Sequence, residues 1–160
     1  MHHHGYLWTG PKGHFDEEAL RRPPPSDPPL PPAPGDTAMQ TLADRYRQVA
    51  AEFPVSGLPP IATAHWLAKP PGLIRGTWEE PKEAAEWLGH QLAEYAPRFQ
   101  SGQDQDTLRL AARVASVARR LAWGGDVSLG FYLERPAFLS LAVVTCSPNR
   151  AASHTPCPMR

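Results

Sequence analysis

The sequence predicts a small α+β domain, and three observations support this. Apolar residues recur at steps of three and four in three stretches between residues 37 and 123, as in amphipathic helices. From residue 127 the period changes to two, which indicates a C-terminal β-hairpin. A dense proline run at residues 23–34 can form neither a helix nor an inner strand. We therefore expect four parts: an extended aromatic head (residues 1–22), a Pro-rich linker (23–35), one α+β domain (36–146) and a flexible tail (147–160).

The head places aromatic side chains among glycines and prolines and shows no helical period. One extended strand fits its first nine residues, and residues 5–9 are a candidate third strand for the hairpin; a partner protomer is the other candidate. The linker is predicted to be a stiff polyproline II rod, because proline lacks the backbone donor and its φ is fixed.

The first helix is expected to start at a capping box formed by Thr37 and Gln40 and to end at Pro54. Residues 54–76 follow as a long proline-containing loop, ordered by its own apolar side chains. The second helix is expected to open at Thr77, with Glu80 completing another capping box, and to run to Pro97. Its solvent face is acidic, and Trp87 lies at the border of the two faces, which predicts an exposed anchor.

The third helix is predicted from about residue 106 to residue 123, ending at a left-handed glycine cap at Gly124. Arg109, Arg113 and Arg120 form a stripe opposite its apolar face. The hairpin strands are expected at residues 127–133 and 138–146. Two strands alone are marginal in water, so the hairpin must lie on the helices or recruit a third strand.

Composition excludes several classes of function. The chain has 16 Lys and Arg against 16 Asp and Glu, so it lacks the positive charge that attracts bulk nucleic acid or anionic membranes. No stretch approaches the roughly 20 apolar residues of a membrane-spanning helix, and no signal peptide is apparent. With only two cysteines, reduced thiols are expected. These observations predict a cytoplasmic protein with no membrane partner.

Two groups of residues offer metal ligands. The amino terminus followed by His2 and His3 fits the arrangement that wraps Cu(II) or Ni(II) in a square plane of nitrogens, although the same residues fit a disordered end or a tag remnant. Cys146, His154 and Cys157 suit zinc, but a fourth ligand is missing and the spacing is wrong for a zinc finger. The simpler interpretation is a buried Cys146 and a free Cys157, so no cofactor is predicted, with Cu, Ni or Zn as alternatives.

Candidate catalytic and anion-binding side chains are few. His90 lies one helical turn from acidic residues on both sides, and His65 precedes a tryptophan in the long loop; either could act as an acid–base group or be an ordinary surface histidine. Arg109, Arg113 and Arg120 could clamp a phosphate or carboxylate or simply solvate a helix. No nucleophile, nucleotide-binding or metalloprotease motif is present.

The leading functional hypothesis is a non-catalytic interaction or accessory protein that docks a protein partner or a second protomer. The sequence supports it with an apolar tip beyond a spacer and with a PxxP-like run that resembles ligands of SH3 and WW modules. The candidate contact residues are Tyr6, Leu7, Trp8, Pro28, Pro29, Leu30, Pro31 and Trp87. The alternatives are a small enzyme with a pocket between residues 54–76 and the hairpin, and a metal-handling protein using the N-terminal histidines.

Overall fold

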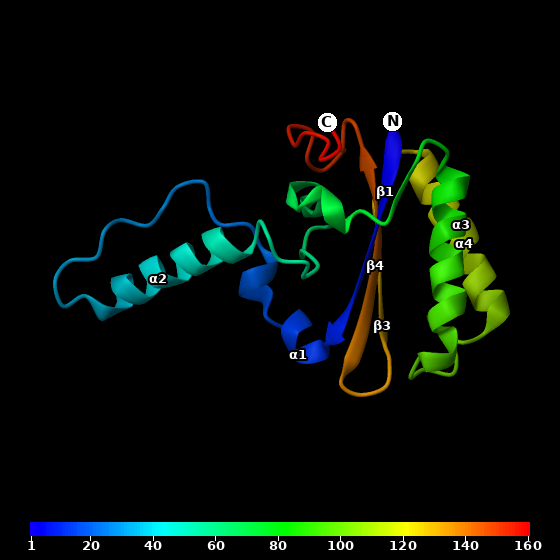
Figure 1. Ribbon diagram of the computed structural model, residues 1–160, viewed down its shortest axis with the longest axis horizontal. Helices are drawn as coiled ribbons and strands as arrows, with labels where there is room; N and C mark the ends of the chain where they lie inside the picture. Colours follow the sequence, from blue (N-terminus) through cyan, green and yellow to red (C-terminus); the bar gives the residue numbers. More distant parts are fainter.

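The computed structural model describes residues 1–160 and confirms a mixed α+β fold. Four antiparallel strands form one sheet in the order β2 (Gly76–Trp78), β1 (His2–Pro11), β4 (Ala137–Cys146) and β3 (Val127–Tyr132). Helices α3 (Pro81–Tyr95) and α4 (Thr107–Ala122) cover one face of this sheet (Figure 1). On the other face lie α1 (Lys12–Phe15), the 3₁₀ turns η1 (Glu18–Arg21) and η2 (Thr63–Ala68), and the C-terminal residues. No helix is both long and apolar enough to cross a bilayer.

Strand β1 lies inside the sheet, so the N-terminal segment is part of the main body. It pairs with β4 over ten residues, from His2 opposite Cys146 to Pro11 opposite Ala137, and with β2 on its other side. Nine of the ten residues of β4 are buried, so this strand needs a partner on each side to satisfy its main chain. The chain's own N-terminus supplies the third strand that the hairpin requires.

This arrangement corrects the placement of the aromatic head. Tyr6 is only 1% exposed and Leu7 and Trp8 are half-buried, because alternate residues of an inner strand face the two covered sides of the sheet. They do not form a tip held away from the core by a spacer.

Two predicted helix N-caps are wrong, although the first helix does begin at Thr37. Thr77 belongs to β2, and α3 begins at Pro81, which tolerates the first helical turn because its missing N–H has no partner there. Helix α2 (Thr37–Glu52) is capped by Asp36 rather than Thr37, with its carboxylate accepting from the Met39 amide at 3.1 Å. The start and end of α4 are confirmed, since Asp106 caps it and Gly124 follows with φ of 86°.

The main core lies between the sheet and the two packed helices. Its buried side chains come from α3, α4, β3 and β4, together with Ala96, Leu133 and Phe99. Phe99 stacks on Phe131 with ring centroids 4.5 Å apart. The close approach of the helices depends on Gly89, where a Cβ would lie 2.8 Å from Cγ2 of Val114. The helix pair therefore shields one face of the sheet from solvent.

Two tryptophans lie over the backbone of β1 at Gly5. A Cβ on Gly5 would lie 2.7 Å from Cζ3 of Trp87 and 3.0 Å from Cζ3 of Trp78, and the two indole rings are 5.2 Å apart. Trp87 is thus half-buried against the core, which corrects its prediction as an exposed anchor. The contact joins α3 and β2 to β1.

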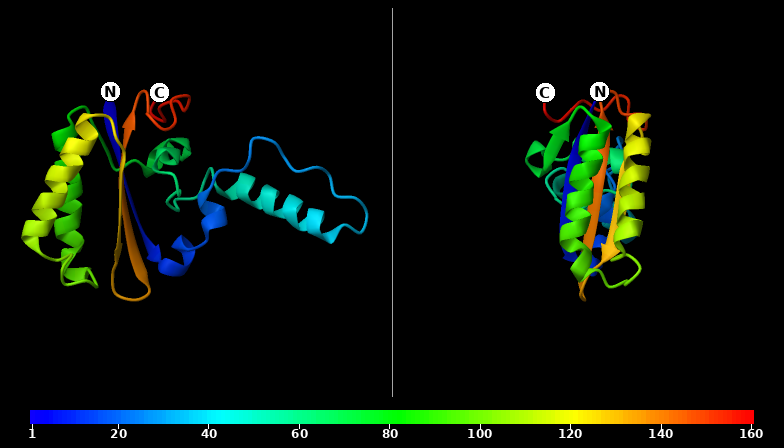
Figure 2. Two further views of the ribbon diagram at one scale, coloured as in Figure 1. Left: turned by 180° about the vertical axis from the view of Figure 1, so that it is seen from behind. Right: turned by 90° about the vertical axis from the view of Figure 1, so that its right-hand side faces the viewer.

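Helix α2 and residues 22–36 extend away from the sheet as an arm (Figures 1 and 2). Only Val49 of the helix is buried. At the base of the arm, the Lys69 ammonium donates to the Phe53 carbonyl at 2.7 Å and lies 3.9 Å from the centroid of the Phe53 ring. The arm is therefore attached at one end.

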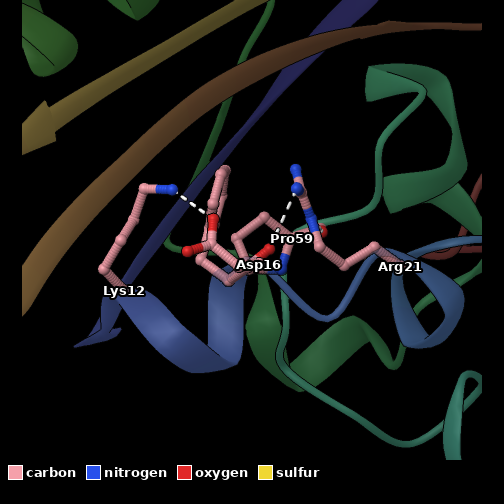
Figure 3. Close-up of polar contacts among 5 residues, drawn as sticks. Lys12, Asp16, Arg21 and Pro59 are labelled. Carbon is pink, nitrogen blue, oxygen red and sulfur yellow. Dashed lines mark hydrogen bonds and ion pairs between the residues drawn. The ribbon is translucent and has the colours of Figure 1, made fainter.

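A second contact fixes the chain where it enters the arm. Arg21 donates from Nε to the Pro59 carbonyl at 2.7 Å and from a terminal nitrogen to the Phe15 carbonyl at 3.0 Å (Figure 3). Lys12 and Asp16 form an ion pair beside it. These contacts fix α1 and η1 on the face of the sheet opposite the helices.

We predict that Gly5→Ala destabilises the fold by about 1–3 kcal/mol, because the added methyl overpacks the two indole rings. Chemical unfolding of the variant and of the parent protein measures the difference. Gly13→Ala is the matched control, since nothing lies within 4 Å of the added Cβ there. Equal losses in the two variants would contradict this account of β1.

Lys69 should make stability depend on alkaline pH. Burial lowers the pKa of Lys69 to about 8, below its value in an unfolded chain, so charging it opposes folding below that pH. As the pH rises from 8 to 10, the free energy of unfolding should increase by about 2 kcal/mol more in the parent protein than in Lys69→Met. Urea unfolding at each pH measures this, and Lys82→Met, at an exposed site, should behave like the parent. Parallel curves for the parent and Lys69→Met would refute it.

Candidate metal centre

Four potential metal ligands meet where the two ends of the chain lie together. The ligand atoms of His2, His4, Cys146 and Cys157 all lie within 4.8 Å of one another, and we call these residues the four-ligand cluster. Nε2 of His2 is 3.1 Å from Nε2 of His4 and 3.2 Å from Sγ of Cys157. Nε2 of His4 is 3.5 Å from the same sulfur.

The fold of β1 and β4 places three of these residues. His2 and His4 are two residues apart on β1, so their side chains point to the same side of the sheet. This is the side away from α3 and α4. His2 lies directly opposite Cys146 in the strand register. Cross-strand neighbours have Cβ atoms about 5 Å apart, which brings an imidazole and a thiol into reach of a common atom.

Cys157 reaches the cluster because Asn149 folds the tail back. The Asn149 amide is 1% exposed, donates to the Asp126 carboxylate at 2.9 and 3.0 Å and donates to the Thr145 carbonyl at 2.7 Å. Its oxygen accepts from the backbone amides of Ala151 and Ala152. Cys157 is a free thiol, as expected, but it is only 5% exposed, which corrects the expectation of a loose cysteine.

Three of the six ligand–ligand separations in the cluster are close to those around a tetrahedral zinc ion, and the others are at most 4.8 Å. Zinc bonds of about 2.3 Å to sulfur and about 2.0–2.1 Å to nitrogen give tetrahedron edges of roughly 3.3–3.8 Å. The separations of 3.1, 3.2 and 3.5 Å around Cys157 and the two imidazoles are close to these edges. Two thiolates and two imidazoles form a ligand set that suits Zn²⁺.

Thr77 orients the His4 ring toward the cluster. Nδ1 of His4 lies 2.8 Å from the Thr77 hydroxyl, so with its proton on Nδ1 the ring presents the lone pair of Nε2 to the other ligands. Burial lowers the pKa of His4 to about 4, which keeps the ring neutral, as a metal ligand must be. Burial also lowers the pKa of His2 and raises that of the Cys146 thiol.

Buried aromatic side chains cover one side of the four-ligand cluster. Tyr6, next on the same face of β1, stacks on Trp66 of η2 with centroids 4.6 Å apart, and both pack with the two cysteines in one buried group. The Tyr6 hydroxyl is buried without a partner, and burial raises its pKa. Metal–ligand attraction is stronger in such a dry setting than in water.

The structure divides the predicted metal ligands between the two faces of the sheet. His3 lies outside the cluster, on the helix side, where its Nδ1 is 3.0 Å from the Thr145 hydroxyl. That hydroxyl donates to the Gly125 carbonyl, so His3 carries its proton on Nδ1. The square-planar arrangement needs main-chain nitrogens of His2 and His3, but their main chain pairs with β4 and β2. His154 is exposed and also lies outside the cluster.

The two predicted acid–base residues do not meet. His90 is exposed on α3, and His65 is half-buried in η2 on the opposite face of the sheet. Neither imidazole ring makes a hydrogen bond. The geometry therefore assigns them no shared chemistry.

The arginine stripe on α4 is engaged locally. Arg113 pairs with Asp104 at 2.9 Å and lies 5.0 Å from the centroid of the Phe131 ring. Arg120 donates from Nε to the Asp126 carbonyl at 2.6 Å, and Arg109 reaches Gln103 at 3.4 Å. Arg113 and Arg120, without Arg109, line a hollow of about 360 Å³ beside β3.

No family model, curated protein or solved structure matches this chain. The four-ligand cluster is therefore the strongest indication of function. Its signal in the sequence is weak, because the ligands lie at opposite ends of the chain. They meet only through the register of β1 on β4 and the turn that Asn149 holds in the tail.

Proposed function

We propose that the protein binds one Zn²⁺ ion through His2, His4, Cys146 and Cys157, and that this site is structural. The observation that carries the proposal is the mutual distance of at most 4.8 Å among four ligand atoms of the right chemistry. Four protein ligands complete a tetrahedron and leave no position for water or substrate, which is typical of structural rather than catalytic zinc.

The ion would join segments that are remote in the sequence. His2 and His4 lie at the start of the central strand, Cys146 at the end of its neighbour and Cys157 in the tail. Chain ends fray unless they are tied down. A metal bound only in the folded state stabilises that state, so zinc would hold both ends of the chain on the sheet.

As its biological role we propose a non-catalytic interaction protein whose sheet the zinc ion stabilises. The supporting observation is the arm, which carries exposed Leu30 and Leu42. A hollow of about 380 Å³ lies between its proline segment and α2, lined by prolines, Leu42 and Tyr46. Pro28 and Pro31 are exposed in this segment, so a partner would meet the arm rather than the buried Tyr6.

We predict that protein produced without an affinity tag contains about one zinc ion per chain. Cys157→Ser should lose most of the metal, because serine replaces a thiolate with a poor ligand. After exchange with Co²⁺, the parent protein should show the visible absorption of tetrahedral cobalt with thiolate charge transfer. Elemental analysis and absorption spectroscopy make these measurements.

His154→Ala is the matched control, because this exposed histidine lies in the same tail but outside the cluster. It should retain the metal content and the cobalt spectrum of the parent. If Cys157→Ser and His154→Ala bound zinc equally well, the assignment of the ligands would be wrong.

Thr77→Val should weaken zinc binding about 10–100-fold, because it removes the hydroxyl that orients the His4 ring. Competition against a chromophoric chelator measures the dissociation constant. Thr77→Ser keeps the hydroxyl and should bind zinc nearly as the parent does. Equal affinities for the valine and serine variants would show that this hydrogen bond does not position His4.

A further inference from the structure

Strand β3 forms a long free edge of the sheet. The opposite edge, β2, has only three residues, whereas β3 has six and pairs with β4 alone. Proteins usually protect such edges with lysine, proline, bulges or a covering segment. Residues 127–132 contain neither lysine nor proline, so the sequence leaves this edge open.

The register shows which main-chain groups are free. The Leu133 amide donates to the Ala137 carbonyl, which fixes the hydrogen-bond pattern between β3 and β4. Odd-numbered residues of β3 therefore form main-chain hydrogen bonds to β4. Even-numbered residues of β3 direct their N–H and C=O groups away from β4. The Tyr132 carbonyl accepts from the Gln100 amide at 2.9 Å. The main-chain groups of Ser128 and Gly130 have no hydrogen-bond partner.

Two hollows follow this edge from end to end. One of about 360 Å³ lies beside Val127, Ser128 and Leu129, and another of about 220 Å³ lies beside Gly130 and Tyr132. They show that no segment of the chain covers the outward groups of Ser128 and Gly130, although Gln100 occupies the Tyr132 carbonyl. There is room beside β3 for an added extended chain.

The flank of α4 above this edge is basic. The helix carries four arginines and no acidic residue, and Arg113, Ser116 and Arg120 line the larger hollow. The acidic residue in that hollow, Asp126, is held by the Asn149 amide and by the backbone amide of Thr145. Asp104, which lines the smaller hollow, pairs with Arg113 at 2.9 Å, so Arg120 is the arginine of the larger hollow without a carboxylate partner. An incoming segment therefore meets free backbone groups beside guanidinium groups.

We propose that an extended acidic peptide segment of a partner protein adds to β3 as a fifth strand. Its main chain would bond to Ser128 and Gly130, and its carboxylates would face Arg120, whose guanidinium has no carboxylate partner. A second copy of this chain fits poorly, because antiparallel pairing of two β3 strands would set the arginine flanks of two α4 helices side by side. This proposal does not depend on zinc.

A fluorescein-labelled peptide of alternating Glu and Thr, about eight residues long, tests the proposal against a matched Lys–Thr peptide. Fluorescence anisotropy should show saturable binding of the acidic peptide, at least about tenfold tighter than the basic one and weaker at higher salt. Equal affinities, or no saturable binding of the acidic peptide, would overturn it. So would a dimer through β3 in sedimentation experiments.

Ser128→Pro tests the strand pairing directly. It removes an outward N–H and no bond to β4, so the fold should persist while peptide affinity falls about three- to tenfold. Ser128→Ala, which keeps the N–H, should bind like the parent. Equal binding by the proline and alanine variants would contradict the model of an added strand.

If Ser128→Pro fails to fold, hydrogen exchange in the parent protein gives the answer. The amides of Ser128 and Gly130 should exchange more slowly when the acidic peptide is bound. Unchanged exchange of both amides at saturating peptide would overturn the proposal.

Discussion

The pairing of β1 with β4 is the constraint on which the rest of the structure depends. Strand β4 is buried along nearly its whole length, so its main chain must find partners on both sides within the molecule. Because side chains alternate along a strand, a slip of one residue would turn His2, His4 and Tyr6 to the helix side. The register that buries Tyr6 against Trp66 also sets His2 opposite Cys146. Packing and ligand geometry are thus two results of one alignment.

Much of the fold could be predicted from the sequence, because helix periodicity and the alternating hairpin are local signals. The cap at Asp106 and the glycine after α4 are local as well. The spacing of Thr77 and Glu80 predicts a helix that begins at Thr77. It is equally compatible with a strand followed by a helix that begins at Pro81, and no local signal distinguishes these two structures. Thr77 instead pairs with β1 and forms a hydrogen bond with the His4 ring, and both are far away in sequence.

The candidate site was harder to predict than the fold. The sequence predicts His2 as a ligand but pairs it with His3 rather than His4, since alternation along a strand matters only once the segment is known to be a strand. The prolines of the tail predict a loose Cys157, whereas Asn149 turns the tail back through bonds to Asp126 and Thr145. Such contacts depend on register and side-chain geometry, which composition and spacing do not contain.

The arm is separate from both proposed sites. Residues 12–75 connect two neighbouring strands, β1 and β2, by a long excursion on the face opposite α3 and α4. Within it, α2 and the proline segment contact the body mainly through Arg21, Phe53 and Lys69, and none of these three belongs to the four-ligand cluster or lines the β3 edge. The strand register that positions the metal ligands lies outside the arm. The exposed, proline-rich arm can therefore change its shape without moving these ligands.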